Sequence, residues 1–220
     1  MMDHMKIYKM TECQPFPFLV VDNFFTEKQL EGIWKELNFY EGKTVLDTVN
    51  IAKNAGKDMA QVKRIYLEKV YRPEGRALSD ILINFNDNLF NQTIVQSYKR
   101  TTPSWLHFWS SNLDHTQLGY MENSDFYTSH FDVSYHTCLV WLFKQPKKFE
   151  GGDLIFTQSK VKVDCVYNRM VLFPSYYMHA VSELKMQDRH LNQGNGRWVL
   201  TKFIERVNMP NEMGDVSVRG

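Results

Sequence analysis

Apolar residues follow helical spacing in two stretches of the N-terminal part of the chain. Thr26 and Gln29 fit a capping box ahead of an apolar stripe that ends at Leu37. A second stripe predicts a helix over about 74–90, with Pro73 at its start. The apolar positions of this second stripe are Leu78, Ile81, Leu82, Phe85 and Leu89. Both stripes are typical of helices that pack one face on a core.

The pattern changes to short apolar and aromatic runs from Thr93 onward, and one earlier run, FPFLVV at 16–21, also predicts a buried strand. Further strands are predicted over about 94–98, 105–110, 116–121, 126–131, 137–143, 153–157, 161–166, 169–173, 178–182 and 197–204. Many short strands at this spacing indicate a barrel or a two-sheet jelly roll. We therefore expect a mainly β, α+β domain with helical support over 1–92, a β core over 93–206 and a tail over 207–220.

A polar, lysine-rich stretch at 42–63 separates the two predicted helices and shows little periodicity. Such a stretch is either a loop over a functional site or a solvated connection. The sequence leaves both interpretations open.

Composition and charge narrow the class of protein. Hydrophobic residues make up 43% of the chain, which is enough for a packed core and argues against disorder. The formal net charge of +1 gives no long-range attraction to nucleic acid or to an anionic membrane. The three cysteines form no CxxC pair, no apolar run reaches the ~20 residues of a membrane helix, and the N-terminus has no apolar signal region. We expect a cytoplasmic protein with no membrane partner.

The strongest chemical signal is the sequence His130-Phe131-Asp132. On an extended strand, His130 and Asp132 point to the same face and can bind one ion. A lone pair of this kind is a weak signal, but His179 follows at the expected start of another strand. Two imidazoles and one carboxylate on one face of a metal suit iron(II) and leave coordination positions open.

Arg197 lies at the start of a late apolar strand, with Thr201 four residues further on the same face. A guanidinium in a dry pocket can bind a carboxylate through two hydrogen bonds. Arg189 is the alternative because it lies closer to His179, but it falls in a polar loop. We therefore favour Arg197 as the carboxylate-binding residue.

These motifs, in this order, resemble the prolyl 4-hydroxylase branch of the iron(II)/2-oxoglutarate dioxygenases. The order comprises Tyr120, Tyr127, His130-x-Asp132, Thr137-x-Leu139, FEGGDL at 149–154, LFPS at 172–175, His179-Ala180-Val181 and Arg197-x-x-x-Thr201. The resemblance covers roughly residues 93–204 and implies a double-stranded β-helix (jelly-roll, cupin-like) core. The chain departs from the family pattern at Trp141, where a tyrosine is common, and in the longer interval between His179 and Arg197.

The resemblance implies that His130, Asp132 and His179 bind iron(II) and that Arg197 binds the C5 carboxylate of 2-oxoglutarate. Thr201 is implied as a secondary contact to 2-oxoglutarate, and Tyr120 either lines the cosubstrate pocket or is a core aromatic. The implied cosubstrates are 2-oxoglutarate and dioxygen, with ascorbate as an accessory cofactor and succinate and carbon dioxide as products.

The substrate implied first is a prolyl residue of a peptide or protein, and second is free proline or another small amino acid. We expect residues 42–63 and 98–109 to border the substrate groove, and nucleic acid to be no partner. Two rival hypotheses remain: a metal-dependent cupin-like enzyme that does not use 2-oxoglutarate, and a jelly-roll binding module without catalysis. In the latter, the three metal ligands should not converge.

Overall fold

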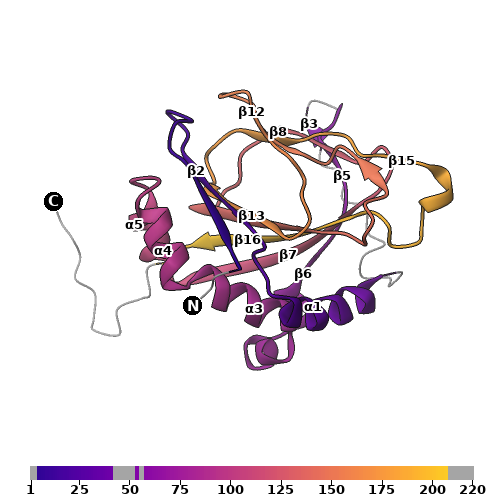
Figure 1. Cartoon of the computed structure of the whole chain (residues 1–220), viewed down its shortest axis with the longest axis horizontal. Helices are drawn as coiled ribbons and strands as arrows, with labels where there is room; N and C mark the ends of the chain where they lie inside the picture. The colour runs from indigo at the N-terminus through magenta and orange to yellow at the C-terminus, as the bar shows by residue number, and fades with distance from the viewer. Residues whose placement is uncertain (1–3, 42–52, 55–56, 208–220) are drawn as a thin grey trace.

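The computed structural model describes residues 4–41, 53–54 and 57–207 (Figure 1). Most of the predicted loop over 42–63 and nearly all of the predicted tail over 207–220 lie outside these residues. Within the described part of the chain, no helix has the length and apolar character needed to cross a membrane.

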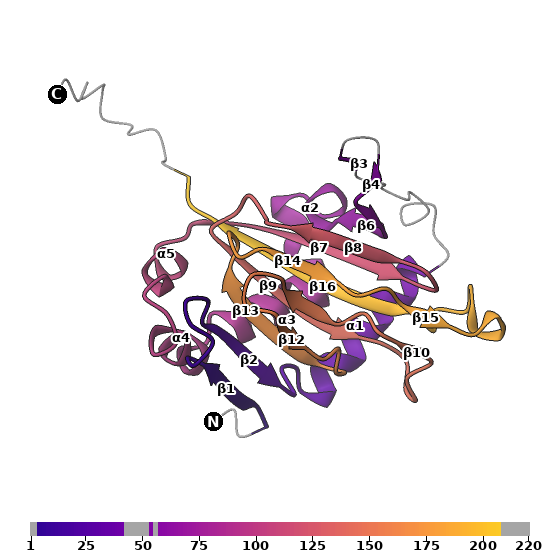
Figure 2. The same ribbon diagram turned by 90° about the horizontal axis from the view of Figure 1, so that it is seen from above.

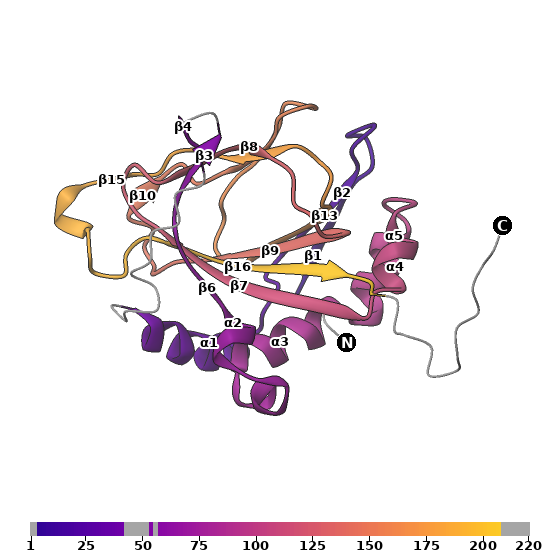
Figure 3. The same ribbon diagram turned by 180° about the vertical axis from the view of Figure 1, so that it is seen from behind.

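Two antiparallel sheets face each other, and helices cover the outer face of the larger one (Figures 1 and 3). The larger sheet has seven strands in the order β1 (Lys6–Met10), β2 (Phe18–Asp22), β13 (Arg169–Pro174), β9 (His136–Leu142), β16 (Arg197–Glu205), β7 (Leu113–Met121) and β6 (Lys63–Tyr66). The smaller sheet has five strands in the order β12 (Val161–Val163), β11 (Leu154–Phe156), β14 (His179–Val181), β8 (Phe126–His130) and β5 (Ala60–Gln61). The predicted jelly-roll core with N-terminal helices is confirmed.

Two strand pairs complete the β structure, β10 (Phe149–Glu150) with β15 (Lys185–Met186) and β3 (Lys53–Asn54) with β4 (Lys57–Asp58). Figure 2 shows β1 and β2 along one edge of the larger sheet and β6 at the opposite edge. Strands from the N-terminal part of the chain therefore extend both sheets, so the β structure is not confined to the predicted core over 93–206.

The helices are α1 (Glu27–Tyr40), α2 (Leu67–Val70), α3 (Asp80–Leu89), α4 (Gln92–Lys99) and α5 (Trp105–Trp109), with 3₁₀ turns η2 (Pro73–Leu78) and η3 (Asp188–His190). The predicted capping box begins α1: the Thr26 hydroxyl accepts from the Gln29 amide over 3.2 Å, and the Thr26 amide donates to Oε1 of Gln29 over 2.9 Å. Helices α1 and α3 lie beneath the larger sheet and bury their apolar stripes against it (Figure 3).

Three predicted elements need correction. The single helix over 74–90 is divided, because Ser79 caps a new helix by accepting from the Leu82 amide over 3.0 Å. Leu78, which was counted in its apolar stripe, is 80% exposed. The strands predicted over 94–98 and 105–110 are helices α4 and α5. Their aromatic and β-branched residues favour strands in isolation, but α4 buries Ile94, Val95 and Tyr98 at helical spacing.

The hydrophobic core has two parts, one on each face of the larger sheet. On β16, Trp198 and Leu200 pack against the helices, whereas Val199 faces the smaller sheet. Because side chains alternate along a strand, this register turns Arg197 and Thr201 toward the space between the sheets. The chemistry that follows lies in that space.

Candidate metal centre and active-site pocket

The pairing of two strands in the smaller sheet brings two histidines together. His130, at the end of β8, lies directly opposite His179, at the start of β14. Their ring centroids are 4.3 Å apart. Strand register therefore brings two histidines that are 49 positions apart in the sequence into one site.

Asp132 completes the cluster from the chain just beyond β8. Its Oδ1 lies 3.6 Å from Nε2 of His130, and its Oδ2 lies 3.5 Å from Nε2 of His179. Ligand atoms of the three residues all lie within 4.8 Å of one another. Atoms that each bind one ion at about 2.1 Å are separated by roughly 3–3.5 Å, so these spacings fit a shared metal.

Hydrogen bonds orient both imidazoles for metal binding. Nδ1 of His130 donates to the Thr128 carbonyl over 2.8 Å, and Nδ1 of His179 donates to the Tyr177 carbonyl over 2.8 Å. A carbonyl only accepts, so Nδ1 carries a proton in each ring, and Nε2 is the ring nitrogen that faces Asp132. Burial, reinforced by His179, lowers the pKa of His130 to about 4, which keeps this imidazole neutral at physiological pH. Two imidazoles and a carboxylate are the donor set that iron(II) oxygenases use.

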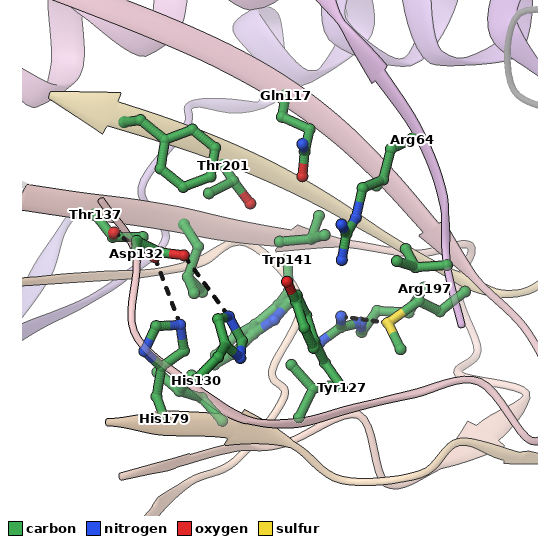
Figure 4. Close-up of a pocket in the computed structure, with 18 residues that line it drawn as sticks. Arg64, Gln117, Tyr127, His130, Asp132, Thr137, Trp141, His179, Arg197 and Thr201 are labelled. Carbon is green, nitrogen blue, oxygen red and sulfur yellow. Dashed lines mark hydrogen bonds and ion pairs between the residues drawn. The ribbon is translucent and has the colours of Figure 1, made fainter. Parts of the chain in front are cut away.

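An inner pocket of about 70 Å³ extends from this cluster between the two sheets (Figure 4). By the usual allowance of ~10–15 Å³ per water, it has room for roughly five to seven water molecules, the size of a small organic acid. Its walls include Trp141, Val199 and Thr201. Thr201 lies on the same face of β16 as Arg197, and both side chains line the inner pocket together with Trp141.

Arg197 closes the end of the pocket away from the histidines (Figure 4). Its side chain is buried, with Nη1 donating to the Gly152 carbonyl over 2.6 Å and Nη2 contacting the sulfur of Met121 at 2.7 Å. Its Nε has no hydrogen-bond partner, and no carboxylate in the described part of the chain forms an ion pair with it. Burial lowers the pKa of Arg197, but an arginine remains charged at neutral pH. A buried cation without an anion is a binding site for one.

Arg189, the alternative carboxylate-binding residue, lies elsewhere. It belongs to the turn η3 and borders a surface depression with Lys148 and Lys185, outside the inner pocket. The geometry therefore favours Arg197 over Arg189.

Tyr120 does not line the inner pocket, so the expectation that it lines the cosubstrate pocket is corrected. It faces the helices, where its ring lies 4.7 Å from that of Trp198. Its hydroxyl donates to Oε1 of Glu122 over 2.7 Å and accepts from the Gly196 amide over 3.0 Å. Because neighbours alternate along β7, Met121 occupies the pocket side instead.

Comparison with known proteins identifies this arrangement. Residues 116–205 match the family model of the 2OG-Fe(II) oxygenase superfamily. They contain His130, Asp132, His179, Arg197 and Thr201.

Residues 116–205 form a 2OG-Fe(II) oxygenase domain.

The chain is also similar to known hydroxylases in sequence and to solved structures in fold. A PKHD-type hydroxylase of Prochlorococcus marinus (strain NATL1A) is 26% identical over 147 residues, which cover 64% of this chain and 62% of that protein. The chain thus matches less than two thirds of that relative's length. A prolyl-4-hydroxylase of Pseudomonas putida is 15% identical with a TM-score of 0.52, and the match covers 93% of this chain and 94% of that one. A prolyl hydroxylase of Trichoplax adhaerens, solved with a hypoxia inducible factor peptide fragment, is 15% identical with a TM-score of 0.55. The match covers 86% of this chain and 83% of that one. This chain shares the fold of these two prolyl hydroxylase structures.

The oxygenase domain also opens into an outer groove of about 760 Å³. Arg64, Gln117 and Tyr127 line both the groove and the inner pocket, so they lie where the two cavities meet. Tyr127 stacks on His130 with ring centroids 3.6 Å apart. No residue of the segment 98–109 lines either cavity, so the expectation that this segment borders the groove is wrong.

Arg64 is the residue that sequence reasoning missed. It follows directly after the polar stretch 42–63, which has no periodicity to reveal which side chains face inward. The structure places it on β6, next to β7 at the edge of the larger sheet. A usable signal was the alternation of Val62 and Arg64, both of which line the inner pocket.

Proposed function

We propose that the protein is an iron(II)- and 2-oxoglutarate-dependent hydroxylase that acts on a C–H bond of a prolyl residue in a peptide or protein. The observation that carries the proposal is the convergence of His130, Asp132 and His179 beside a pocket closed by an unpaired buried Arg197. The names of the related hydroxylases support the prolyl substrate.

Each residue of the site has a defined task in this proposal. His130, Asp132 and His179 hold iron(II), which, when bound, activates dioxygen. Arg197 binds the distal carboxylate of 2-oxoglutarate and thereby sets the direction in which this cosubstrate enters the pocket. Thr201, on the same face of β16, contacts the same carboxylate.

The two atoms of dioxygen have different destinations in this reaction. One atom of dioxygen enters the substrate as a hydroxyl group, and the other enters succinate as 2-oxoglutarate loses carbon dioxide. The apolar walls of the inner pocket, which include Leu139, Leu154 and Val181, exclude water from the reacting atoms.

A cupin-like enzyme that does not use 2-oxoglutarate would have no need of a buried cation at the end of the pocket. Arg197 forms no ion pair with a carboxylate of residues 4–41, 53–54 or 57–207, and it therefore favours the 2-oxoglutarate hypothesis over that rival. The convergence of the three ligand residues argues against a binding module without catalysis.

The proposal is tested first by binding. Anaerobic addition of iron(II) and 2-oxoglutarate should produce a weak visible charge-transfer band, and aerobic incubation should release succinate slowly even without a substrate. His130→Ala and His179→Ala should lose both signals, whereas His107→Ala, at an exposed position outside both cavities, should keep them. Normal succinate release by the two ligand variants, or no band in folded wild-type protein, would refute the proposal.

The substrate is tested by mass spectrometry. Proline-containing peptides and free amino acids are incubated with the enzyme, and the products are searched for the mass of one added oxygen atom. Hydroxylation of internal prolyl residues supports the first substrate class. Hydroxylation of free proline or another small amino acid instead would replace it with the second.

A further inference from the structure

Arg64 lies at the junction of the inner pocket and the outer groove. It projects from β6 at the edge of the larger sheet and faces the pocket between Gln117 and Tyr127 (Figure 4). Arg64 lines both cavities together with His130 and Asp132, so a molecule that occupies the outer groove beside the metal site also lies close to this side chain.

The guanidinium of Arg64 has no anionic partner in the described part of the chain. Its one recorded contact is with the ring of Tyr127, 4.7 Å from the guanidinium carbon to the ring centroid. Stacking occupies one face of a guanidinium and leaves the N–H groups at its edge available. Tyr127 itself stacks on His130. Arg64 is therefore held beside the metal site by its flat face, and among the described residues its N–H groups have no hydrogen-bond acceptor.

A second donor accompanies it. The side chain of Gln117 is 8% exposed, lines both cavities, and forms no side-chain hydrogen bond within the described residues. Because its amide atoms are not fully buried, they open to the two cavities and are available to a ligand there. Arg64 and Gln117 together present free N–H groups to the same space.

The charge of the inner pocket indicates how much negative charge it can accept. Arg64 and Arg197 contribute +2 and Asp132 contributes −1, and iron(II) would bring the sum to +3. Bound 2-oxoglutarate, with two carboxylates, reduces this to +1. One positive charge remains, and it belongs to Arg64, because Arg197 is already assigned to 2-oxoglutarate.

We propose that Arg64, assisted by Gln117, binds a carboxylate group of the molecule to be hydroxylated. This inference rests on the iron(II)- and 2-oxoglutarate-dependent chemistry of the proposed function, and it replaces the internal prolyl residue with a substrate that has a free carboxylate. The substrate then carries a single carboxylate close to the reacting carbon, as a free amino acid or the C-terminal residue of a peptide does. A prolyl residue inside a peptide has its carboxyl group in an amide bond and lacks that charge.

Matched acids and amides test the inference. The panel consists of the twenty common L-amino acids, their amides, and acetyl-Gly-Ala-Pro as the acid and as the amide; acetyl-Gly-Ala-Pro-Gly amide supplies an internal proline. Stimulation of succinate release is measured aerobically, and affinity is measured by calorimetry under argon with manganese(II) and 2-oxoglutarate bound. We expect the best acid to bind roughly tenfold to hundredfold more tightly than its amide, the range of one charge-assisted contact. The free acids and the peptide acid distinguish the two sources of the carboxylate.

Arg64→Gln should remove this preference. In the variant, the acid should bind only as well as its amide, and the amide should bind the variant and the wild type about equally. A purely structural role for Arg64 would instead weaken acid and amide alike. Arg72→Gln is the matched control, because Arg72 is exposed and lines neither cavity.

Several results would overturn the inference. For the wild type, these are equal binding of acid and amide, preference for the internal proline, or no response to any acid in the panel. For Arg64→Gln, it is weaker binding of 2-oxoglutarate with unchanged binding of the acid. Succinate release without substrate and anaerobic 2-oxoglutarate binding are measured first. If both are missing, the proposed function fails. If both are present and the acid preference is missing, only the assignment of Arg64 fails.

Discussion

The Thr137 hydroxyl donates a hydrogen bond to Oδ2 of Asp132 over 2.6 Å. Thr137 lies on β9 of the larger sheet, whereas Asp132 follows β8 of the smaller sheet. The same hydroxyl lies 2.8 Å from that of Ser175, whose carbonyl accepts from the Asp132 amide over 3.0 Å. Asp132 is thus fixed both through its side chain and through its backbone, and the carboxylate is oriented before a metal arrives.

Thr137→Val should weaken metal binding because it removes the hydroxyl while keeping the shape of the side chain. Loss of a hydrogen bond to a ligating carboxylate typically costs about 10–100-fold in metal affinity. Manganese(II) titration followed by electron paramagnetic resonance measures the change. Thr93→Val, at an exposed position of α4, serves as the control and should bind as the wild type does. Unchanged affinity in the Thr137 variant would show that Asp132 needs no support from β9.

Arg197→Gln should raise the concentration of 2-oxoglutarate needed for half-maximal succinate release by roughly tenfold to hundredfold, because a charged hydrogen-bond donor is lost from a buried site. Arg189→Gln should have little effect, since Arg189 borders a surface depression. The measurement is a titration of 2-oxoglutarate with each variant under the same iron concentration. A larger effect at position 189 would transfer the role to Arg189.

Gly152→Ala should impair 2-oxoglutarate binding without touching any ligand. Gly152 has φ +73°, and an added Cβ would lie 3.0 Å from Cδ of Arg197 and 2.9 Å from Cδ1 of Leu184. The left-handed backbone adds about 1 kcal/mol of strain, and the contact displaces the guanidinium from its place at the end of the pocket. We expect several-fold weaker 2-oxoglutarate binding by calorimetry. Gly75→Ala, where a Cβ meets nothing within 4 Å, should bind normally; equal behaviour of the two variants would contradict this reasoning.

His136 should make the protein less stable in acid. Burial, reinforced by His107, lowers its pKa to about 3 in the folded state, against about 6.5 when unfolded. Between these values the unfolded state binds the proton and the folded state does not, so the free energy of unfolding falls as the pH falls. This group alone should remove about 2 kcal/mol between pH 7 and pH 5.

His136→Phe tests that expectation, because the ring packs between Tyr98 and Phe108 and phenylalanine does not titrate. Urea unfolding at pH 7 and pH 5, with a chelator present, should show a smaller loss of stability in the variant than in the wild type. His115→Gln, in the outer groove, is the control and should retain the wild-type difference. The prediction fails if the free energy of unfolding falls by the same amount between pH 7 and pH 5 in His136→Phe as in the wild type.

Much of the site was predictable because its residues stand in short motifs on strands. His130 and Asp132 are two positions apart, and alternation alone put Arg197 and Thr201 on one face. Tyr120 was harder to place, since β7 is buried on both faces from Thr116 to Met121 and apolar alternation therefore gives no sign of which side faces the pocket. Alternation needs one polar face to be informative.

Local composition also misled the assignment of α4 and α5. Their aromatic and β-branched residues suit strands, and the deciding signal was the cap at Asn91, whose side chain accepts from the Thr93 amide over 2.9 Å. The alternation of Val62 and Arg64 shows only that the two side chains share a face, and which face lines the pocket depends on the pairing of β6 with β7 across many residues of sequence.

The strands β5 and β6 are separated by Val62 alone, yet β5 pairs with β8 in the smaller sheet and β6 pairs with β7 in the larger one. A single residue therefore spans the two sheets at the mouth of the pocket. Inserting or deleting a residue there would shift Arg64 to the other face of β6 while leaving every metal ligand in place. The crossover at Val62 therefore lets the side chains at the mouth of the pocket change independently of the metal ligands, which lie on or next to other strands.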